Sequence, residues 1–575
     1  MSQSSRWRTR GLAILAGLLF ALAFPPFGLV AGFGAFVALV PMLIALEDTK
    51  RLRDAFSIGY LMMFVASLIA TYWVGGWRGE GSVDPFLMIG GVALALVHPI
   101  FLVVPVLVYD AFRRRFGRIA ALVALPVIWI GFEYWHSTGD LSFPWLSLYN
   151  TQTYNTAFIQ FIEFTGSYGL SLVILLVNIL VYLLLRQRQF VSPPVGEALK
   201  VSGFRGGVRK WIVAAIVMLI VLPYSYGLMV LAEGSLPIDN TTQRSITVTI
   251  VQPNINPWDK WSTGIEAVTD SMFRSTRTAI RAAGTEKPDL VLWPETAITY
   301  PVTLKWTQNQ LSNVYGFVSS IGAAVLTGIP DREEYINGVD AIPRDAKKSK
   351  DPMLFYRDWN SSMLFYIGLD GRPTYERYHK QKLVPFGEHV PFVDWFPILG
   401  DWFQWGVGLG SWNSGEGYDV LRLPLSRAGR TAPDTAKLCT MICYESVYPS
   451  YVRKFVANGA EVIGIITNDG WYGKSSGPYQ HNRYAILRAV ENRRWVIRSA
   501  NTGISSVIDD KGHILEDRPL FTSTSITRRI LLDGQQTLYT QLGDYIAVPC
   551  EWALAAMIVL LVGMRFASHK NRRES

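Results

Sequence analysis

The sequence predicts a multi-pass α-helical membrane domain joined to an α/β domain outside the membrane. Three observations support this fold class. Half of the 575 residues are apolar and only 17% are charged, which is too apolar for an ordinary water-soluble protein. Eight apolar segments lie near the roughly 20 residues that a helix needs to cross a bilayer. Between the seventh and the eighth segment, about 300 residues alternate strand-like and helix-like patterns, as layered α/β domains do.

The apolar segments lie at both ends of the chain. The first is short, and Pro25-Pro26 separates it from the second, so two tight spans or one re-entrant hairpin fit this region. The arginines before it resemble the start of a signal peptide, but no small-residue cleavage site follows, so we expect a retained anchor. The predicted spans are 11–24, 28–46, 55–74, 86–108, 119–135, 166–185, 211–231 and 545–566.

Basic residues predict the orientation of these spans. Lys and Arg gather before the first segment, in the loops after the second, fourth and sixth, and after the eighth, whereas the other loops hold almost none. Because cytoplasmic loops carry the positive charge, both termini are expected in the cytoplasm and the large domain on the outer face. The net charge of +9 is then an orientation signal and does not indicate nucleic-acid binding. The predicted domains are 1–235 (seven spans), 236–544 (external domain) and 545–575 (last span and cytoplasmic tail).

The external domain contains regularly spaced apolar runs. The intervening amphipathic stretches predict helices at 265–283 and 479–492, which gives a mixed α/β pattern. The charge-rich stretch 331–352 is predicted to be a mobile surface loop. The strand-like runs are 246–252, 289–293, 323–327, 362–367, 438–443, 462–467 and 496–499.

Reactive side chains follow three of the strand-like stretches. Pro294 stops one strand and presents Glu295, Lys380 and Lys382 follow a second, and Cys443 ends a third. Parallel strand ends are where α/β folds collect their sites. A thiol needs a base or a nearby cation to become a thiolate. A poorly solvated glutamate can accept its proton, and a lysine can stabilise both thiolate and oxyanion. The three stretches therefore predict a nucleophilic cysteine site.

The remaining cysteines and histidines predict neither a disulfide nor a metal site. Cys439 and Cys443 lie about 13 Å apart along one strand, beyond the roughly 7 Å that a disulfide allows. Cys439 is expected in the core, and Cys550 lies in the last span. No metal-spaced histidine cluster and no glycine-rich phosphate loop appears in the sequence. We therefore expect no metal and no cofactor.

Three motifs carry a family resemblance. W-P-E-T at Glu295, Y-x-K-x-x-L-V-P-F-G-E at Lys380 and C-Y-E-S at Cys443 resemble the Glu-Lys-Cys motifs of the nitrilase superfamily. With membrane spans on both sides, and with further matching blocks at 468–472, 488–493 and 501–503, the whole chain resembles the apolipoprotein N-acyltransferases, the membrane-bound branch of that superfamily. The resemblance implies that the external domain is a nitrilase-like α-β-β-α sandwich.

The resemblance also implies roles for individual residues. Glu295 is expected to be the general base, Lys380 the oxyanion stabiliser and Cys443 the acyl-accepting nucleophile. The Y-x-K spacing favours Lys380 over Lys382, which is a rival on the bare sequence. The expected supporting residues are Glu388, Tyr444, Glu445 and Trp261, with Trp258 as an alternative to Trp261.

Two stretches are predicted to bring lipid to the thiol. The stretch 385–412 is unusually aromatic, and tryptophan favours membrane–water boundaries. We expect it to form a lid at the outer leaflet, and the alternative is a loop packed into the core. The stretch 136–164 is expected to lie on the membrane beneath the catalytic domain. The lid would include Trp395, Phe396, Trp402 and Trp405.

The resemblance implies a two-step acyl transfer in the bacterial inner membrane. A membrane phospholipid would donate an acyl group to Cys443 as a thioester, and the N-terminal amine of a diacylglyceryl-modified apolipoprotein would accept it. One alternative is a membrane-tethered amidase or nitrile hydrolase that releases acid to water. A transporter is the other alternative, but it predicts paired intramembrane charges and broken helices, of which the sequence shows few signs.

Overall fold

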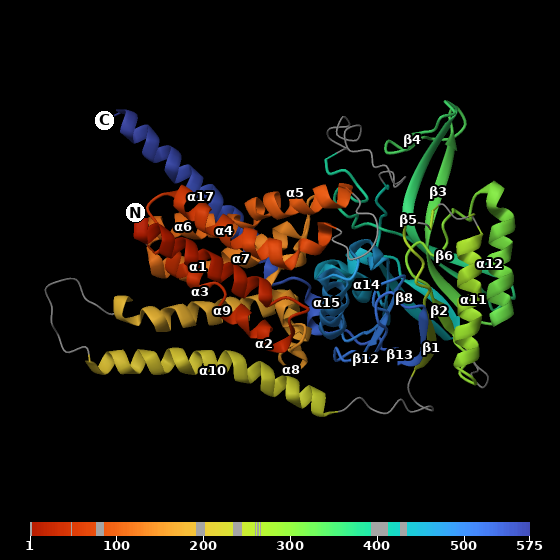
Figure 1. Ribbon diagram of the computed structural model, residues 1–575, viewed down its shortest axis with the longest axis horizontal. Helices are drawn as coiled ribbons and strands as arrows, with labels where there is room; N and C mark the ends of the chain where they lie inside the picture. Colours follow the sequence, from red (N-terminus) through yellow and green to blue (C-terminus); the bar gives the residue numbers. More distant parts are fainter. Residues whose placement is uncertain are drawn as a thin grey trace.

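The structure is a computed structural model in which a helical bundle and an α/β domain lie side by side (Figure 1). Both chain termini lie at the end of the bundle that is remote from the α/β domain. The structure describes residues 3–47, 49–75, 85–190, 202–233, 244–258, 260–261, 264, 266–392, 412–425 and 434–574.

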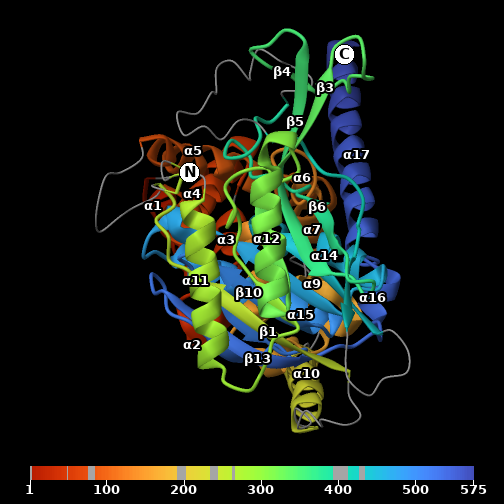
Figure 2. The ribbon, with the colours of Figure 1, turned by 90° about the vertical axis from the view of Figure 1, so that its right-hand side faces the viewer.

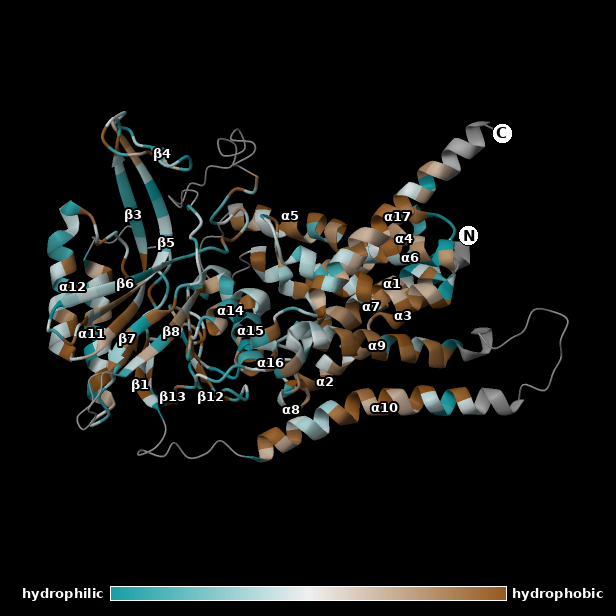
Figure 3. Ribbon diagram, turned by 180° about the vertical axis from the view of Figure 1, so that it is seen from behind, coloured by the Kyte–Doolittle hydropathy of each residue, from teal (hydrophilic) through white to brown (hydrophobic). Residues whose placement is uncertain are grey.

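The bundle consists of the predicted apolar segments. Its helices are α1 (Gln3–Leu22), α2 (Gly28–Gly32), α3 (Val40–Leu46), α4 (Leu52–Ala70), α5 (Pro85–Leu102), α6 (Val104–Phe116), α7 (Arg118–His136), α9 (Ile162–Phe190), α10 (Ser202–Ala232) and α17 (Ala547–Glu574). Apolar residues are concentrated on these helices (Figure 3). In the described residues, seven helical stretches are long and apolar enough to cross a membrane: 28–46, 52–70, 87–116, 118–136, 162–186, 207–232 and 547–567. The chain is therefore a membrane protein.

The bundle differs from the prediction at its N-terminal end. Most of the first predicted span, 11–24, belongs to α1, which ends at Leu22 and packs against α4. This helix has three arginines in its first half and is not among the seven membrane-length stretches. The second predicted span is not one helix, because a 3₁₀ turn (η1, Phe33–Phe36) separates α2 from α3. The fourth is divided between α5 and α6, where Pro105 occupies the first turn of α6.

Short helical turns connect α7 to α9 and lie between the bundle and the α/β domain. Trp145 in this connection packs against Tyr444, His481 and Tyr484 of the α/β domain. The predicted position of this stretch beneath the catalytic domain therefore agrees with the structure. The turns are η3 (Pro144–Leu146), η4 (Leu148–Gln152) and α8 (Thr156–Ile159).

Two mixed sheets form the centre of the α/β domain. The first has the order β13-β1-β2-β3-β5-β4 with β6 beside β5, and the second has the order β12-β11-β10-β9-β8-β7. β1, β2 and β3 are parallel, as are β8, β9 and β10. The strands are β1 (Ser245–Gln252), β2 (Leu290–Leu292), β3 (Ala324–Ile336), β4 (Lys347–Lys348), β5 (Leu354–Ile367), β6 (Pro373–His379), β7 (Leu421–Leu425), β8 (Asp434–Ile442), β9 (Val462–Thr467), β10 (Trp495–Ala500), β11 (Ser506–Ile508), β12 (Ile514–Asp517) and β13 (Thr524–Leu531).

Alternating side chains on the strands build a four-layer sandwich. In β2, Leu290 and Leu292 enter the core shared with the second sheet, whereas Val291 joins a separate core beneath α11 and α12, because successive side chains point to opposite faces. α11 (Ala267–Ala282) and α12 (Gln308–Ile321) cover the outer face of the first sheet (Figure 2). α14 (Pro449–Ala457) and α15 (Ser476–Asn492) lie between the second sheet and the bundle (Figure 1). The short helix α16 (Leu538–Leu542) leads into α17, and the order of layers is the predicted α-β-β-α.

The charge-rich stretch that was predicted as a loop is partly strand, so that prediction is wrong for its first residues. β3 continues to Ile336 and pairs with β5 along its whole length. Cross-strand ion pairs stabilise this polar hairpin, for example between Arg332 Nε and Asp358 Oδ1 at 2.6 Å. The sequence of this hairpin does not alternate apolar and polar residues, because both faces of the hairpin tip are at least partly exposed to solvent.

Candidate active site

An open pocket lies where the strand ends of the two sheets meet the bundle. Its wall includes Leu87 at the start of α5, so a membrane-length helix contributes directly to it. Glu295, Lys380 and Cys443, which the sequence predicts as reactive residues, all line this pocket. The lining residues are Leu87, Trp258, Trp261, Glu295, Thr296, Asn360, Lys380, Val384, Gly387, Glu388, Trp412, Cys443, Asn468, Trp471 and Tyr472.

Cys443 is held at a sharp turn directly after β8. Its backbone φ is +53°, a left-handed conformation that is unusual for a residue with a side chain. The turn ends the strand and begins the 3₁₀ turn η6 (Cys443–Val447), and it leaves the side chain half-buried. Burial and the Glu295 carboxylate raise the pKa of the Cys443 thiol, although Lys380 acts in the opposite direction. The resting thiol is therefore protonated and needs a base.

Glu295 follows β2 and is held by both its backbone and its side chain. Its carboxylate Oε1 accepts a hydrogen bond from Asn360 Nδ2 at 2.8 Å and lies 3.6 Å from Lys380 Nζ. Its backbone carbonyl accepts a bond from Lys260 Nζ at 3.1 Å. Gly328 of β3 passes so close that a Cβ there would lie 2.5 Å from Glu295 Cα. Backbone packing therefore determines where this carboxylate lies.

Lys380 is a buried cation paired with carboxylates. It follows β6, and its Nζ lies 2.8 Å from Glu388 Oε2 with only 1% of the side chain exposed. Burial alone would lower the pKa of Lys380, but the neighbouring charges of Glu388, Glu295 and Cys443 raise it above the ordinary value. Lys380 therefore remains charged beside the thiol.

Lys382, the rival lysine on the bare sequence, lies outside this pocket. β6 ends at His379, so both lysines lie after the strand. Lys382 Nζ lies over the ring of Tyr448, 5.2 Å from its centroid. The structure thus brings Lys380, and not Lys382, to Glu295.

Asn360 connects two carboxylates and was not predicted from the sequence as a site residue. Its Nδ2 donates to Glu295 Oε1 at 2.8 Å and to Glu388 Oε1 at 2.9 Å. Glu388, predicted as a supporting acid, also accepts from the Val384 backbone N–H at 2.9 Å. Asn360 lies within β5, and no motif in the sequence identifies an asparagine in a strand as part of a site.

Glu445 connects the turn at Cys443 to the turn at Lys380. Its carboxylate accepts backbone N–H bonds from Ile442 and Gln381, each at 2.8 Å, and a bond from the Tyr378 hydroxyl at 2.6 Å. Burial raises the pKa of Glu445, and these donors oppose that rise. Glu445 therefore fixes two strand ends relative to each other and lies outside the pocket wall.

Tyr444 connects the nucleophile turn to the membrane domain. Its hydroxyl donates to the Ser142 carbonyl at 2.8 Å, and its ring stacks on Phe143 and Trp145 with centroid separations of 6.1 and 6.4 Å. The residue after Cys443 is thus packed on the connection between α7 and α9.

Some of the predicted aromatic residues line the pocket, and others lie outside the described residues. Trp258 and Trp261 both line the pocket, so the two candidates are not separated. Trp412, at the end of the predicted lid, also lines it. The predicted lid residues Trp395, Phe396, Trp402 and Trp405 lie outside the described residues, and the lid therefore stays a prediction.

A cluster next to Cys443 contains metal-binding residue types. The Cys443 thiol, an Asp469 carboxylate oxygen and a His481 ring nitrogen lie within 4.8 Å of one another. However, Arg498 Nη2 donates to Asp469 Oδ2 at 2.8 Å and lies 3.1 Å from His481 Nδ1. A guanidinium in this position neutralises the carboxylate and repels a metal cation. We therefore interpret the cluster as an ion-pair network.

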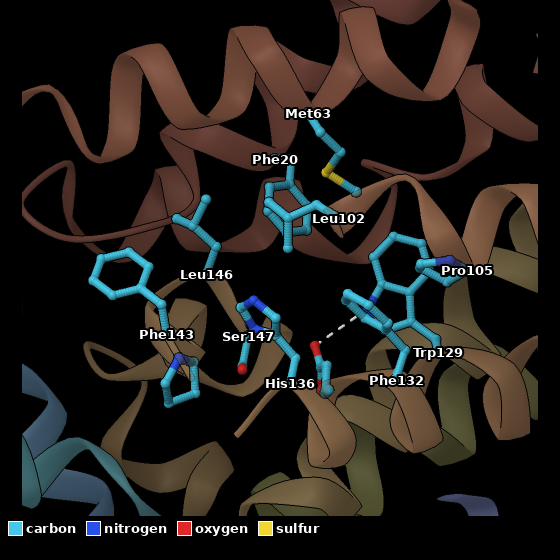
Figure 4. A pocket seen from close by; sticks show the side chains of 12 residues that line it. Phe20, Met63, Leu102, Pro105, Trp129, Phe132, His136, Phe143, Leu146 and Ser147 are labelled. Carbon is cyan, nitrogen blue, oxygen red and sulfur yellow. Dashed lines mark hydrogen bonds between the residues drawn. The ribbon is translucent and has the colours of Figure 1, made fainter. Parts of the chain in front are cut away.

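A second, smaller cavity lies inside the bundle beneath the connection between α7 and α9. Figure 4 shows Phe20, Met63 and Leu102 on one side of it and His136 on the other. The buried Glu133 carboxylate in its wall accepts bonds from the Leu148 N–H and the Ser171 hydroxyl, both at 2.7 Å. These two bonds hold the Glu133 carboxylate in the wall of the cavity.

Comparisons with known proteins identify both parts of the chain. Residues 16–180 match the family model described as apolipoprotein N-acyltransferase N-terminal domain, and residues 247–538 match the carbon-nitrogen hydrolase model. An apolipoprotein N-acyltransferase of Chlorobaculum tepidum is 32% identical over 96% of both chains. One of Geobacter metallireducens is 28% identical over 97% of this chain and 96% of its own.

The chain is less similar to solved structures than to these sequence relatives. Saccharomyces cerevisiae Nit3, a member of the nitrilase superfamily, is 15% identical, with a TM-score of 0.34 over 50% of this chain and 90% of its own. The assignment does not depend on this match, because the sequence relatives span nearly the whole chain. The chain belongs to the apolipoprotein N-acyltransferase family and is a membrane acyltransferase whose α/β domain is of the carbon-nitrogen hydrolase type.

Proposed function

We propose that this protein N-acylates the N-terminal S-diacylglyceryl-cysteine of apolipoproteins, with a membrane phospholipid as the acyl donor. One observation carries the proposal: a thiol, a carboxylate and a buried lysine line one pocket whose wall includes a membrane-length helix. Covalent acyl transfer needs such a nucleophile and base, and a lipid donor needs contact with the bilayer. The names of the relatives support the lipoprotein acceptor.

In the first half-reaction, Glu295 accepts the proton of the Cys443 thiol as Sγ attacks the ester carbonyl carbon of the phospholipid. The charged Lys380 and neighbouring N–H groups stabilise the oxyanion of the tetrahedral intermediate. The C–O bond to the glycerol then breaks, and the protonated Glu295 returns its proton to the leaving alkoxide. The products are a lysophospholipid and a thioester on Cys443.

In the second half-reaction, the neutral α-amine of the lipoprotein's first cysteine attacks the thioester carbonyl. Glu295 takes a proton from the attacking nitrogen, the C–S bond breaks, and the thiolate recovers a proton. The products are an amide and the free thiol of Cys443. Because one thiol serves both substrates in turn, the kinetics are of the ping-pong type.

The proposal includes the location of these steps. The catalytic domain, 236–544, lies on the periplasmic face of the bacterial inner membrane, and both termini are cytoplasmic. The charge pattern of the loops supports this orientation, and so does the position of both termini at the end of the bundle remote from the α/β domain.

A partition experiment tests the function. Purified protein is incubated with acyl-labelled phospholipid and a synthetic diacylglyceryl-cysteine peptide, and label in the amide and in free fatty acid is measured. The proposal predicts that most label reaches the amine and that Cys443→Ser abolishes transfer, whereas Cys439→Ser does not. The carbon-nitrogen hydrolase match also suits a membrane-tethered amidase. Label that reaches only water would support that alternative and contradict the transferase.

A further inference from the structure

The buried cluster next to Cys443 has no part in the chemistry proposed above. It contains Ser446 of η6, Asp469 of the 3₁₀ turn η7 (Asp469–Tyr472), His481 of α15 and Arg498 of β10. All four side chains are at least 95% buried. Four elements therefore bring polar groups together beside the residue that is proposed to carry the acyl group.

Both ring nitrogens of His481 have hydrogen-bond partners. Nδ1 lies 2.9 Å from Asp469 Oδ1 and 3.1 Å from Arg498 Nη2. Nε2 lies 3.0 Å from the backbone carbonyl oxygen of Cys443 and 3.0 Å from the Ser446 hydroxyl. A carbonyl oxygen can only accept a hydrogen bond. His481 therefore donates from Nε2 to the Cys443 carbonyl, and Asp469 and Arg498 hold the other side of its ring.

The carbonyl that His481 contacts belongs to the strained residue. Cys443 has a φ of +53°, and such conformations persist only where surrounding contacts hold them. Its carbonyl accepts from His481 Nε2 and also from the Ser446 hydroxyl at 2.9 Å. Because a trans peptide fixes the N–H opposite the C=O, the same contacts determine the direction of the Tyr444 N–H.

We propose that His481 is a positioning residue for the nucleophile. Its imidazole, held by Asp469 and Arg498, donates from Nε2 to the Cys443 carbonyl and so fixes the turn that presents the thiol. His481 does not line the pocket, so it acts through Cys443 and not on the substrate. The inference rests on the proposed role of Cys443 as nucleophile.

The test measures the thiol directly. In the detergent-purified full chain, the rate of Cys443 alkylation by iodoacetamide is followed between pH 7 and 9. Mass spectrometry of the Cys443 peptide separates it from Cys439 and Cys550. His481→Leu removes the Nε2 donor from the Cys443 carbonyl, so the turn should no longer hold the thiol in place and alkylation is expected to slow about tenfold at each pH. It should lower kcat and leave the KM for phospholipid unchanged.

Two further variants make the test decisive. His481→Gln keeps a donor for the Cys443 carbonyl, so it should recover most of kcat and most of the alkylation rate. His513→Gln is the matched control, because His513 pairs with Asp509 at 3.0 Å in the same domain, and it should behave like the wild type.

A wild-type alkylation rate in a folded His481→Leu protein would overturn the proposal, and so would a His481→Gln protein that alkylates as slowly as His481→Leu. If His481→Leu does not fold, His481→Asn, whose shorter amide does not reach the carbonyl, takes its place. Slow alkylation in the Leu or Asn variant, with no acyl transfer by the wild type, would contradict the proposed function and leave the role of His481 intact.

Discussion

At the scale of single residues, the site depends on buried charges that face one another across strand ends. Lys380 lies between Glu295 and Glu388, and Asn360 donates to both carboxylates. The thiol is protonated at rest because burial and Glu295 disfavour its charge. The effect of a residue on the thiol pKa can be separated from its effect on catalysis. The alkylation rate of Cys443 reports the first, and the rate of acyl transfer reports the second.

Glu295 and Lys380 should affect the thiol in opposite directions. Glu295→Gln removes a negative neighbour, so the pKa of Cys443 should fall and alkylation at pH 8 should accelerate, although acyl transfer is lost with the base. Lys380→Met removes a positive neighbour, so the pKa should rise and both alkylation and acyl transfer should slow. Iodoacetamide rates and single-turnover transfer measure the two quantities. Parallel losses of alkylation in both variants would contradict these roles.

Asn360 should be needed for acyl transfer. Asn360→Ala removes a donor shared by two buried carboxylates, and hydrogen bonds to charged groups contribute about 1.5–3 kcal/mol, so acyl-enzyme formation should slow at least tenfold. The matched control is Asn413→Ala, because Asn413 bonds to Asp345 and Asp358 outside the pocket. Equal effects of both substitutions would show that Asn360 acts only on folding.

At the scale of elements, the close approach of β3 to the turn after β2 determines the position of the base. A Cβ at Gly328 would lie 2.4 Å from the Thr296 nitrogen, and a backbone neighbour cannot move as a side chain can. Gly328→Ala should therefore displace Glu295 and reduce transfer about a hundredfold, the scale expected for a 1 Å misplacement. Gly316→Ala in α12 meets open space and should keep full activity and gain about 0.5–1 kcal/mol. Full transfer activity in Gly328→Ala would contradict this account.

Local signals in the sequence were enough for the two strands that lead to Glu295 and Cys443. An apolar run that ends at Pro294 predicts a strand stop before Glu295, and the run before Cys443 predicts β8. Edge strands such as β6 and β12 were missed because their side chains are mostly half-exposed and lack clean alternation. Asn360, His481 and Lys260 reach the site through pairings between distant segments, which no local pattern reveals.

At the scale of the whole molecule, the α/β domain is joined to the bundle by specific polar contacts. Gln480 of α15 accepts bonds from the indoles of Trp73 and Trp145 at 2.9 and 2.6 Å. It donates to the carbonyls of Pro25 and Ala70 at 2.8 and 3.0 Å. One buried amide thus connects α15 to three segments of the membrane domain.

Loss of this amide should weaken the junction between the two parts. Gln480→Ala removes four hydrogen bonds and leaves the Trp145 indole N–H and the Pro25 carbonyl unpaired, whereas Trp73 Nε1 still donates to the Ala70 carbonyl at 3.1 Å. Each unpaired buried group costs about 1 kcal/mol or more, so the midpoint of thermal unfolding in detergent should fall by several degrees. Gln536→Ala, which loses a single bond to the Ala457 carbonyl, should change it little. An unchanged midpoint for Gln480→Ala would show that the junction does not depend on this residue.

The measurement that tests the central claim most directly is the intact mass of the protein after incubation with phospholipid alone. The account predicts a mass increase of one acyl group, located on Cys443 and removed by hydroxylamine or by a diacylglyceryl-cysteine peptide. Cys443→Ala should show no such adduct, and Cys439→Ala should show it in full. Acyl transfer to the peptide by a protein that never carries an acyl group on Cys443 would contradict the account.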